Sequence, residues 1–364
     1  MKVTVQSRAG PYVVEIGPGL LSGLAEDPSG TGISGRVAVV TDANVRRLWG
    51  DRLREGLAGA GLDPVLLEIP PGEGSKTLGQ AEALWTGLIE AGFGRGDTVL
   101  ALGGGVVGDL TGFVAATFHR GVRLVQAPTT LLAQVDSSIG GKVAIDHPLG
   151  KNLIGAFHPP VRVVSDVSTL RTLPVRERWN GLAEVVKTAV VLDGELFEEL
   201  ETALPALGDG QEDDTGWAGV VGRTAALKAR LVSDDELERG PRMLLNFGHT
   251  VGHALEAATG HGPLSHGEAV VLGMRAAVAV SERLGRIGPE QAHRVGAVLD
   301  QFPRPPPVPR PTREAVRAVL GRDKKASAGR IRFVVLDGLG RGAIEPALSE
   351  ELLGFTIDRA LELL

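Results

Sequence analysis

The chain has 364 residues, more than a single ordinary hydrophobic core organises, so two domains are expected. Its 43% hydrophobic and 23% charged residues are typical of a soluble globular protein. The net charge of -6 argues against a nucleic-acid partner, because affinity for a phosphate backbone needs a basic surface. With no cysteine, no signal-like start and no long uninterrupted apolar run, the sequence predicts a cytoplasmic protein without a membrane partner.

Short β-branched runs alternate with amphipathic stretches as far as about residue 175. The predicted strands are 1–6, 36–41, 64–69 and 97–102, and the predicted helices are 45–61 and 78–92. This alternation predicts a parallel sheet with crossover helices, in which ligands bind beyond the carboxyl ends of the strands. Residues 1–175 are therefore expected to form a Rossmann-like α/β nucleotide-binding domain.

The pattern changes from about Pro174 to long helical periodicity, as in residues 176–192 and 269–284. The proline-rich segment 302–311 is interpreted as an extended connector, and a strand-like run follows at 330–336. Residues 176–364 are therefore predicted to form a second, mainly α-helical domain.

Three of the eight histidines lie close together in this second half. In a helix, His249 and His253 would share one face, and a turn at residues 261–265 would let a second element bring His266 beside them. Two imidazoles with a carboxylate and an open position are typical of a catalytic zinc site. A lone pair at this spacing would as readily be helix surface or core, but the third histidine and the nearby glycines favour a metal site.

Glycines follow the predicted strand at 97–102. The run from Gly103 to Gly105 leads into a helix, whose N-terminal amides could hold a pyrophosphate, although its spacing departs from the usual dinucleotide fingerprint. A purely structural turn is the alternative. Asp42 ends an earlier strand, so it could bind ribose hydroxyls or cap the following helix.

Polar residues of the middle segment suggest a site for an anion. Lys142, Lys151 and Asn152 could together hold an anionic group, whereas each lysine alone would be interpreted as solvated surface. Glu184 lies among apolar residues and is expected to start an apolar helix. Its carboxylate then needs a partner, either a metal or Lys187 at a spacing of three.

In this order the motifs resemble those of 3-dehydroquinate synthases. The matching segments reach to about residue 337 and are Asp42, 73–76, 103–109, 128–142, 151–152, 181–187, 246–253, 266–268 and 323–325. The resemblance implies a lyase of the shikimate pathway that converts the sugar phosphate acid 3-deoxy-D-arabino-heptulosonate 7-phosphate to 3-dehydroquinate and phosphate. It implies transient oxidation by NAD, phosphate elimination, reduction and an intramolecular aldol closure. A divalent metal, zinc or alternatively cobalt, and a homodimer are also implied.

The resemblance further assigns roles to individual positions. It implies metal ligation by Glu184, His249 and His266, and a substrate contact for His253, whereas the spacing argument alone would enlist both His249 and His253. The implied cofactor-binding residues are Asp42, Glu73, Lys76, Gly103, Gly104, Gly105, Val106, Asp109, Thr129, Thr130, Asp136, Lys142 and Lys151. The implied catalytic residues are Asp136, Lys142, Lys187, Asn246 and His253. The implied substrate-binding residues are Arg120 from a neighbouring subunit, Asn152, Lys228, Arg242 and one of Lys324 and Lys325.

Three other functions compete with this interpretation: a different sugar phosphate cyclase, a metal-dependent NAD alcohol dehydrogenase and a non-catalytic nucleotide-binding module. Lys228, Arg242 and Asn246 match the positions that bind the substrate carboxylate in dehydroquinate synthases, which favours these over sister cyclases. Pro241 stands where an aliphatic residue is expected. A simple alcohol would not need the phosphate and carboxylate clusters, and a non-catalytic module would not need four polar clusters around two cofactors.

Overall fold

The computed structural model describes residues 1–260, 262–326 and 331–364, and for residues 25, 29 and 322–326 it describes the backbone alone. The chain divides into two compact units, Met1–Glu177 with Glu212–Leu237 and Arg178–Gln211 with Glu238–Leu364. This partition differs from a single boundary after residue 175, because the segment 212–237 groups with the first unit. Helical periodicity shows that such a segment has an apolar face, but it does not show which core receives that face.

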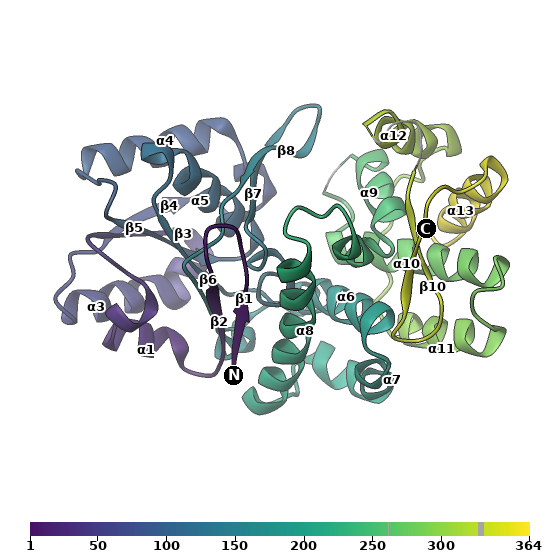
Figure 1. Ribbon diagram of the computed structural model, residues 1–364, viewed down its shortest axis with the longest axis horizontal. Helices are drawn as coiled ribbons and strands as arrows, with labels where there is room; N and C mark the ends of the chain where they lie inside the picture. The colour runs from purple at the N-terminus through teal and green to yellow at the C-terminus, as the bar shows by residue number, and fades with distance from the viewer. Residues whose placement is uncertain (261, 327–330) are drawn as a thin grey trace. The chain divides into compact units, whose positions relative to one another are not determined.

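A seven-stranded sheet forms the centre of the first unit (Figure 1). Its strands, in order across the sheet, are β1 (Lys2–Val5), β2 (Tyr12–Gly17), β9 (Arg162–Asp166), β6 (Arg123–Pro128), β5 (Thr98–Gly103), β3 (Val37–Asp42) and β4 (Val65–Ile69). The pairs from β2 to β4 are parallel, and β1 pairs antiparallel with β2 at one edge. The predicted α/β fold of the N-terminal part is confirmed.

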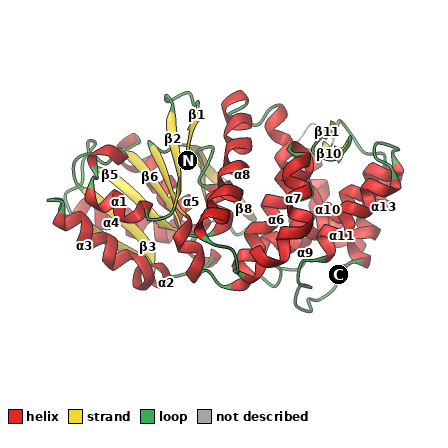
Figure 2. Cartoon of the chain, turned by 90° about the horizontal axis from the view of Figure 1, so that it is seen from below, coloured by secondary structure: helices red, strands yellow, loops and turns green. Residues whose placement is uncertain are grey.

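Helices cover both faces of this sheet (Figure 2). They are α1 (Leu20–Glu26), α2 (Ala43–Val45), α3 (Asp51–Gly59), α4 (Leu78–Glu90) and α5 (Gly105–Thr117). Val37 and Val39 of β3 enter the core beside α1 and α3, whereas Ala38 and Val40 enter the core beside α4 and α5. Because side chains alternate along a strand, a strand buried on both faces must be apolar throughout, as β3 is.

The remaining elements of the first unit are short 3-10 or π-helical segments, a hairpin and one long helix. The short helical segments are η1 (Ser29–Thr31), η2 (Arg46–Gly50), η3 (Glu73–Ser75), η4 (Phe118–Arg120), η5 (Ala133–Ser137) and η6 (Val167–Thr172). The strands β7 (Lys142–His147) and β8 (Gly150–Phe157) form an antiparallel hairpin. Helix α8 (Asp214–Asp234) packs against β1, β2 and η5.

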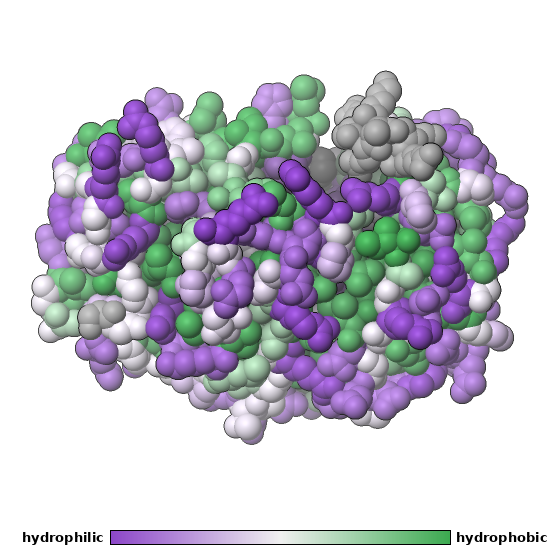
Figure 3. All heavy atoms as spheres, in the orientation of Figure 1, coloured by the Kyte–Doolittle hydropathy of each residue, from purple (hydrophilic) through white to green (hydrophobic). Residues whose placement is uncertain are grey.

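The second unit is mainly helical, as predicted. Its elements are α6 (Val175–Leu192, in this unit from Arg178), α7 (Gly194–Asp209), η7 (Pro241–Asn246), α9 (His249–Ala258), α10 (His266–Arg283), α11 (Pro289–Asp300), α12 (Arg313–Ala326), the pair β10 (Phe333–Leu336) and β11 (Gly342–Glu345), and α13 (Glu350–Glu362). Residues 303–312 form no helix or strand, which is consistent with the predicted connector. Among the described residues, no helix combines the length and apolarity that a membrane crossing would require. On the face in Figure 3, polar side chains are interspersed with small apolar areas.

Candidate functional site

Close packing of α9 against α10 determines where the three histidines lie. Gly248, the N-cap of α9, has a φ of 78°, a conformation that residues with a Cβ rarely adopt. A Cβ on Gly273 of α10 would lie 1.9 Å from the carbonyl oxygen of Gly248, and a Cβ on Gly252 would lie 2.9 Å from that of Ala269. Side chains at these positions would force the helices apart. The glycines around the histidines therefore have a structural purpose.

The histidines gather as the sequence predicts. The ligand atoms of His249, His253 and His266 lie within 4.8 Å of one another. The ring centroid of His249 lies 5.1 Å from that of His253, one helical turn later on α9, and 5.1 Å from that of His266, the first residue of α10. His249 is buried, His266 is half-buried and His253 is exposed.

Glu184 of α6 faces two of these imidazoles. Its Oε1 atom lies 3.4 Å from Nε2 of His249 and 3.2 Å from Nε2 of His266, and its Oε2 atom accepts a hydrogen bond from Lys187. Both predicted partners of this carboxylate, Lys187 and the cluster of predicted metal ligands, are therefore beside it. Glu184 lies inside α6 and not at its start, because that helix already begins at Val175.

The other ring nitrogens of the two histidines have acceptors of their own. Nδ1 of His266 lies 3.3 Å from Oε2 of Glu256, and Nδ1 of His249 lies 3.3 Å from the carbonyl oxygen of Phe247. Both Nε2 atoms are thereby directed at Glu184. Ligand atoms on a tetrahedral zinc ion, with bonds of about 2.0–2.1 Å, lie about 3.3 Å apart. The two separations from Oε1 of Glu184, 3.4 Å and 3.2 Å, match this spacing, and the donor set of a carboxylate and two imidazoles fits zinc.

Burial and charge give these groups different protonation states. Burial lowers the pKa of His249 to about 3. Burial acts in the same direction on His266, but hydrogen bonds with Glu184 and Glu256 outweigh it and raise its pKa to about 10. Burial would raise the pKa of Glu184, yet Lys187, His249 and His266 hold it well below its usual range. Near neutral pH, Glu184 is thus anionic, His249 neutral and His266 protonated.

A second polar group of the same unit surrounds Glu238, a residue that the sequence interpretation missed. Its Oε1 accepts a hydrogen bond of 2.6 Å from Nδ2 of Asn246, and its Oε2 lies 3.9 Å from Nε of Arg242. Arg242 is only 3% exposed, so its charge is held inside the protein beside this carboxylate. Glu238 has a φ of 56°, and nothing in the sequence pattern around it signals that conformation.

The predicted cofactor residues follow the carboxyl ends of parallel strands in the first unit. β3 ends at Asp42, β5 ends at Gly103, and β6 ends at Pro128, immediately before Thr129 and Thr130. β5 pairs with both β3 and β6, so these three ends are neighbours at one edge of the sheet. This is the edge at which open parallel sheets bind nucleotides.

The glycine run at this edge forms a tight turn, and it begins helix α5 without a capping side chain. A Cβ on Gly103 would lie 2.6 Å from Cγ2 of Val107, and a Cβ on Gly104 would lie 2.9 Å from Cγ2 of Thr130. Gly104 is the N-cap of α5 and supplies no capping side chain. The structural-turn interpretation is therefore correct. The helix N-terminus has no capping side chain, and pyrophosphate binding there stays a prediction.

Asp42 caps the short helix that follows it. Its Oδ1 accepts hydrogen bonds from the backbone nitrogens of Asn44 at 2.8 Å and Val45 at 3.1 Å. The capping alternative is thus confirmed for this oxygen, and ribose binding stays a prediction.

A buried lysine connects the loop after β4 with α5 and the β7–β8 hairpin. Lys76, 3% exposed, donates to Oδ2 of Asp109 at 2.8 Å and to Oδ1 of Asn152 at 2.5 Å. Burial would lower the pKa of Lys76, but Asp109 and further carboxylates raise it. Glu73 lies 3.8 Å from Lys76 and 3.6 Å from Lys151, so five predicted residues meet here. Sequence reasoning missed Asp146, whose Oδ1 accepts from the backbone nitrogen of Asn152 at 2.8 Å.

The other predicted residues lie in several places. Lys228 of α8 donates to the carbonyl oxygen of Asp136 at 2.6 Å and to its Oδ1 at 2.5 Å, within the first unit. Lys142 begins β7 and is exposed, and Arg120 in η4 is exposed with a φ of 67°. The side chains of Lys324 and Lys325, and all of residue 261, lie outside the described residues.

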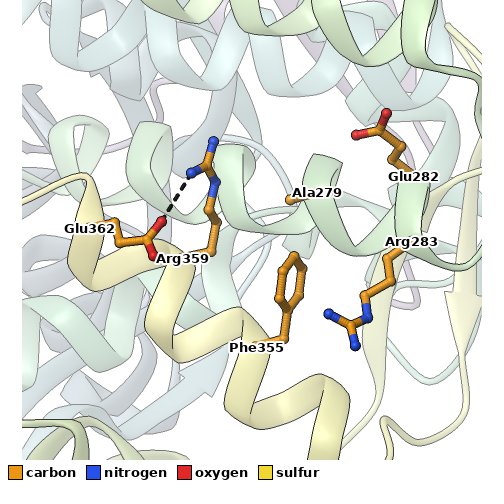
Figure 4. Close-up of a pocket in the computed structure, with 6 residues that line it drawn as sticks. All are labelled: Ala279, Glu282, Arg283, Phe355, Arg359 and Glu362. Atoms are coloured by element: carbon orange, nitrogen blue, oxygen red, sulfur yellow. Dashed lines mark hydrogen bonds and ion pairs between the residues drawn. The ribbon is translucent and has the colours of Figure 1, made fainter.

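A shallow pocket of about 460 Å³ lies elsewhere in the second unit, between α10 and α13 (Figure 4). It is lined by Ala279, Glu282, Arg283, Phe355, Arg359 and Glu362. Arg283 lies 4.6 Å from the ring centroid of Phe355, and Arg359 pairs with Glu362 at 3.0 Å. The first contact joins α10 to α13 and the second lies within α13, and none of these residues belongs to the predicted site.

Comparison with known proteins identifies the family of this chain. The family models 3-dehydroquinate synthase N-terminal and 3-dehydroquinate synthase C-terminal match residues 66–180 and 181–326. The 3-dehydroquinate synthase of Caulobacter vibrioides is 46% identical to this chain, and the alignment covers 93% of this chain and 96% of that protein. The 3-dehydroquinate synthase of Geobacter metallireducens is 45% identical, and the alignment covers 90% of this chain and 91% of that protein. The solved 2-epi-5-epi-valiolone synthase of Streptomyces hygroscopicus, with NAD⁺ and Zn²⁺ bound, superimposes with a TM-score of 0.88 at 29% identity and covers 96% of this chain and 97% of its own. The chain therefore belongs to the 3-dehydroquinate synthase family.

Proposed function

We propose that this lyase converts 3-deoxy-D-arabino-heptulosonate 7-phosphate to 3-dehydroquinate and phosphate without net oxidation. Family membership supports the reaction, and the observation that carries its chemistry is the convergence of Glu184, His249 and His266. A dehydrogenase could use a similar metal site, but a simple alcohol has no group that needs the buried cation of Arg242.

Glu184, His249 and His266 would hold a divalent metal through Oε1 and the two Nε2 atoms, and zinc is the metal that we propose. His253 is exposed beside them and is proposed to contact substrate. NAD⁺ would bind at the edge formed by Asp42, the glycine turn and Thr129–Thr130, with Glu73, Lys76, Val106, Asp109 and Lys151 around it. The valiolone synthase with NAD⁺ and Zn²⁺ bound, at 29% identity, supports both cofactors.

When bound, the metal would polarise the substrate hydroxyls as a Lewis acid and NAD⁺ would accept and return a hydride. The chain's own residues orient the charged ends of the substrate. Arg242, with Asn246, suits the carboxylate, because a cation beside an amide matches its charge and hydrogen-bonding capacity. The family resemblance adds Lys228 to these residues.

Lys142 and Asn152 suit the phosphate, together with Lys324 or Lys325 and Arg120 of the partner subunit. Held in this way, a phosphate oxygen can take the proton that is removed during elimination, so positioning is the protein's main contribution. Lys187 would hold Glu184 charged, and His253 and Asp136 would relay hydroxyl protons. We further propose a cytoplasmic homodimer, which the family resemblance supports.

The test incubates the zinc-loaded protein with 3-deoxy-D-arabino-heptulosonate 7-phosphate and a small amount of NAD⁺, and follows phosphate, dehydroquinate and NADH absorbance together. Equal release of phosphate and dehydroquinate, far beyond the NAD⁺ supplied and with steady absorbance, is expected. Net NADH accumulation would instead indicate a dehydrogenase. Turnover of sedoheptulose 7-phosphate or glucose 6-phosphate alone would indicate a sister cyclase and refute the carboxylate assignment.

A further inference from the structure

A buried carboxylate on α9 has no role in the reaction as proposed above. Glu256 is 5% exposed and lies between apolar neighbours of the same helix. A carboxylate removed from water needs a partner that compensates its charge. Its Oε2 atom lies 3.3 Å from Nδ1 of His266, on the next helix. Glu256 also lies seven residues after His249, so the two side chains share the face of α9 that looks onto this cluster.

These contacts form a chain across three helices. Glu256 of α9 meets Nδ1 of His266 on α10, and Nε2 of the same ring lies 3.2 Å from Glu184 of α6. His249 is arranged differently, because its Nδ1 faces the neutral carbonyl oxygen of Phe247 at 3.3 Å. Of these two rings, His266 is therefore the one whose Nδ1 atom faces a carboxylate.

We infer that Glu256 is a positioning residue for the metal: it holds the His266 ring with Nε2 toward Glu184 and makes that nitrogen a stronger donor. This inference rests on the proposed metal site. A carboxylate that accepts the second N–H of a ligating imidazole fixes its orientation and tautomer and increases its basicity, and loss of such a partner typically costs about 10- to 100-fold in metal affinity.

Two substitutions separate orientation from charge. Glu256→Gln retains an oxygen that can accept from Nδ1 but removes the negative charge. Glu256→Leu fills similar space and removes both. Glu201→Gln is the matched control, because Glu201 is also a carboxylate of the second unit, paired with Arg294 at 2.5 Å and absent from the predicted site.

The measurement is the zinc dissociation constant of each full-length protein, by competition with a chromogenic chelator at fixed pH. The visible spectrum of the cobalt-loaded protein reports the ligand geometry independently of activity. Circular dichroism of each metal-free variant establishes whether it is folded. We expect zinc affinity to fall severalfold in Glu256→Gln and about 10- to 100-fold in Glu256→Leu, with a changed cobalt spectrum in the latter and no change in the control.

Unchanged affinity and spectrum in a folded Glu256→Leu protein would overturn the inference, as would an equal loss in Glu201→Gln, which would reveal general destabilisation. Should Glu256→Leu not fold, wild-type affinity in Glu256→Gln would overturn it. A wild-type protein that bound no zinc would refute the proposed metal site itself. Tight zinc binding by a wild-type protein without turnover would refute only the proposed reaction, and the zinc affinities of the variants would still test the role of Glu256.

Discussion

Nε2 of His266 lies 3.2 Å from Oε1 of Glu184, although 82 positions separate the two residues in the chain. The contact between their helices explains this proximity. The backbone nitrogen of Gly267 donates to Oδ1 of Asn180 at 2.5 Å, and a Cβ on Gly267 would lie 2.5 Å from the carbonyl oxygen of Asn180. α10 thus touches α6 one residue after His266 and one turn before Glu184, which holds the two side chains together.

Metal binding is expected to release a proton from His266. Its pKa of about 10 means that the metal-free protein carries this proton near neutral pH, whereas His249, with a pKa of about 3, has none to lose. Calorimetry in buffers of different ionisation enthalpy should find about one proton released per zinc at about pH 7.5.

The raised pKa also has a consequence for the metal-free fold. Since the folded pKa lies above the ordinary value of 6.5, the His266 contribution to stability is complete below pH 6.5 and is lost as the pH rises through about 10.

In the calorimetry experiment, zinc binding without proton release would show that Nε2 of His266 is not a ligand or is already deprotonated.

Arg242→Ala is expected to weaken substrate binding and to leave the metal in place. If Arg242 binds the substrate carboxylate as proposed, loss of this buried partner costs about 2–5 kcal/mol, so KM should rise about 30-fold or more. His249→Ala is the contrasting variant, and it should lose both bound zinc and turnover. Steady-state kinetics and metal analysis distinguish the two. Stoichiometric tight zinc in His249→Ala would contradict the ligand assignment.

Gly273→Ala should destabilise the second unit. The added Cβ would lie 1.9 Å from the carbonyl oxygen of Gly248, so α9 and α10 would have to separate, at a cost of about 1–3 kcal/mol or more. Urea unfolding measures this change, and zinc affinity should fall with it. Gly296→Ala on α11 is the control, because no atom lies within 4 Å of its added Cβ, and it should stabilise by about 0.5–1 kcal/mol. Equal effects at both glycines would show that the helix contact is looser than described.

His158 should make the first unit sensitive to mild acid. Burial lowers its pKa below 6.5, and its Nε2 lies 2.9 Å from the carbonyl oxygen of Val122, to which the neutral ring can donate. A lowered histidine pKa contributes stability that is complete above pH 6.5 and is lost as the pH falls toward the folded pKa, by at most about 1.4 kcal/mol per pH unit. Comparison of the free energy of unfolding of the wild type and His158→Gln, between about pH 7.5 and 5.5, isolates this term. Parallel pH profiles of the two proteins would contradict it.

Arg120→Ala and His249→Ala should complement each other if Arg120 acts in the partner subunit. Mixed dimers of the two inactive proteins would contain one site in which neither substitution is present, so part of the activity should return after subunit exchange. Light scattering and activity assays on the mixture provide the measurement. No recovery, with exchange shown by differently tagged subunits, would mean that Arg120 serves its own subunit or none.

The sequence alone determined the alternating strand and helix pattern, the shared helix face of His249 and His253, and the family, because periodicity, spacing and motif order are local properties of the chain. Tertiary structure decided which groups meet. It brought Glu184 to two imidazoles and placed Glu256 at Nδ1 of His266. It also placed Glu238 beside Asn246, and it grouped helix α8, which carries Lys228, with the first unit. The physical reason is that such contacts depend on how closely helices pack, and at Gly248, Gly267 and Gly273 this is set by the space that a missing side chain leaves.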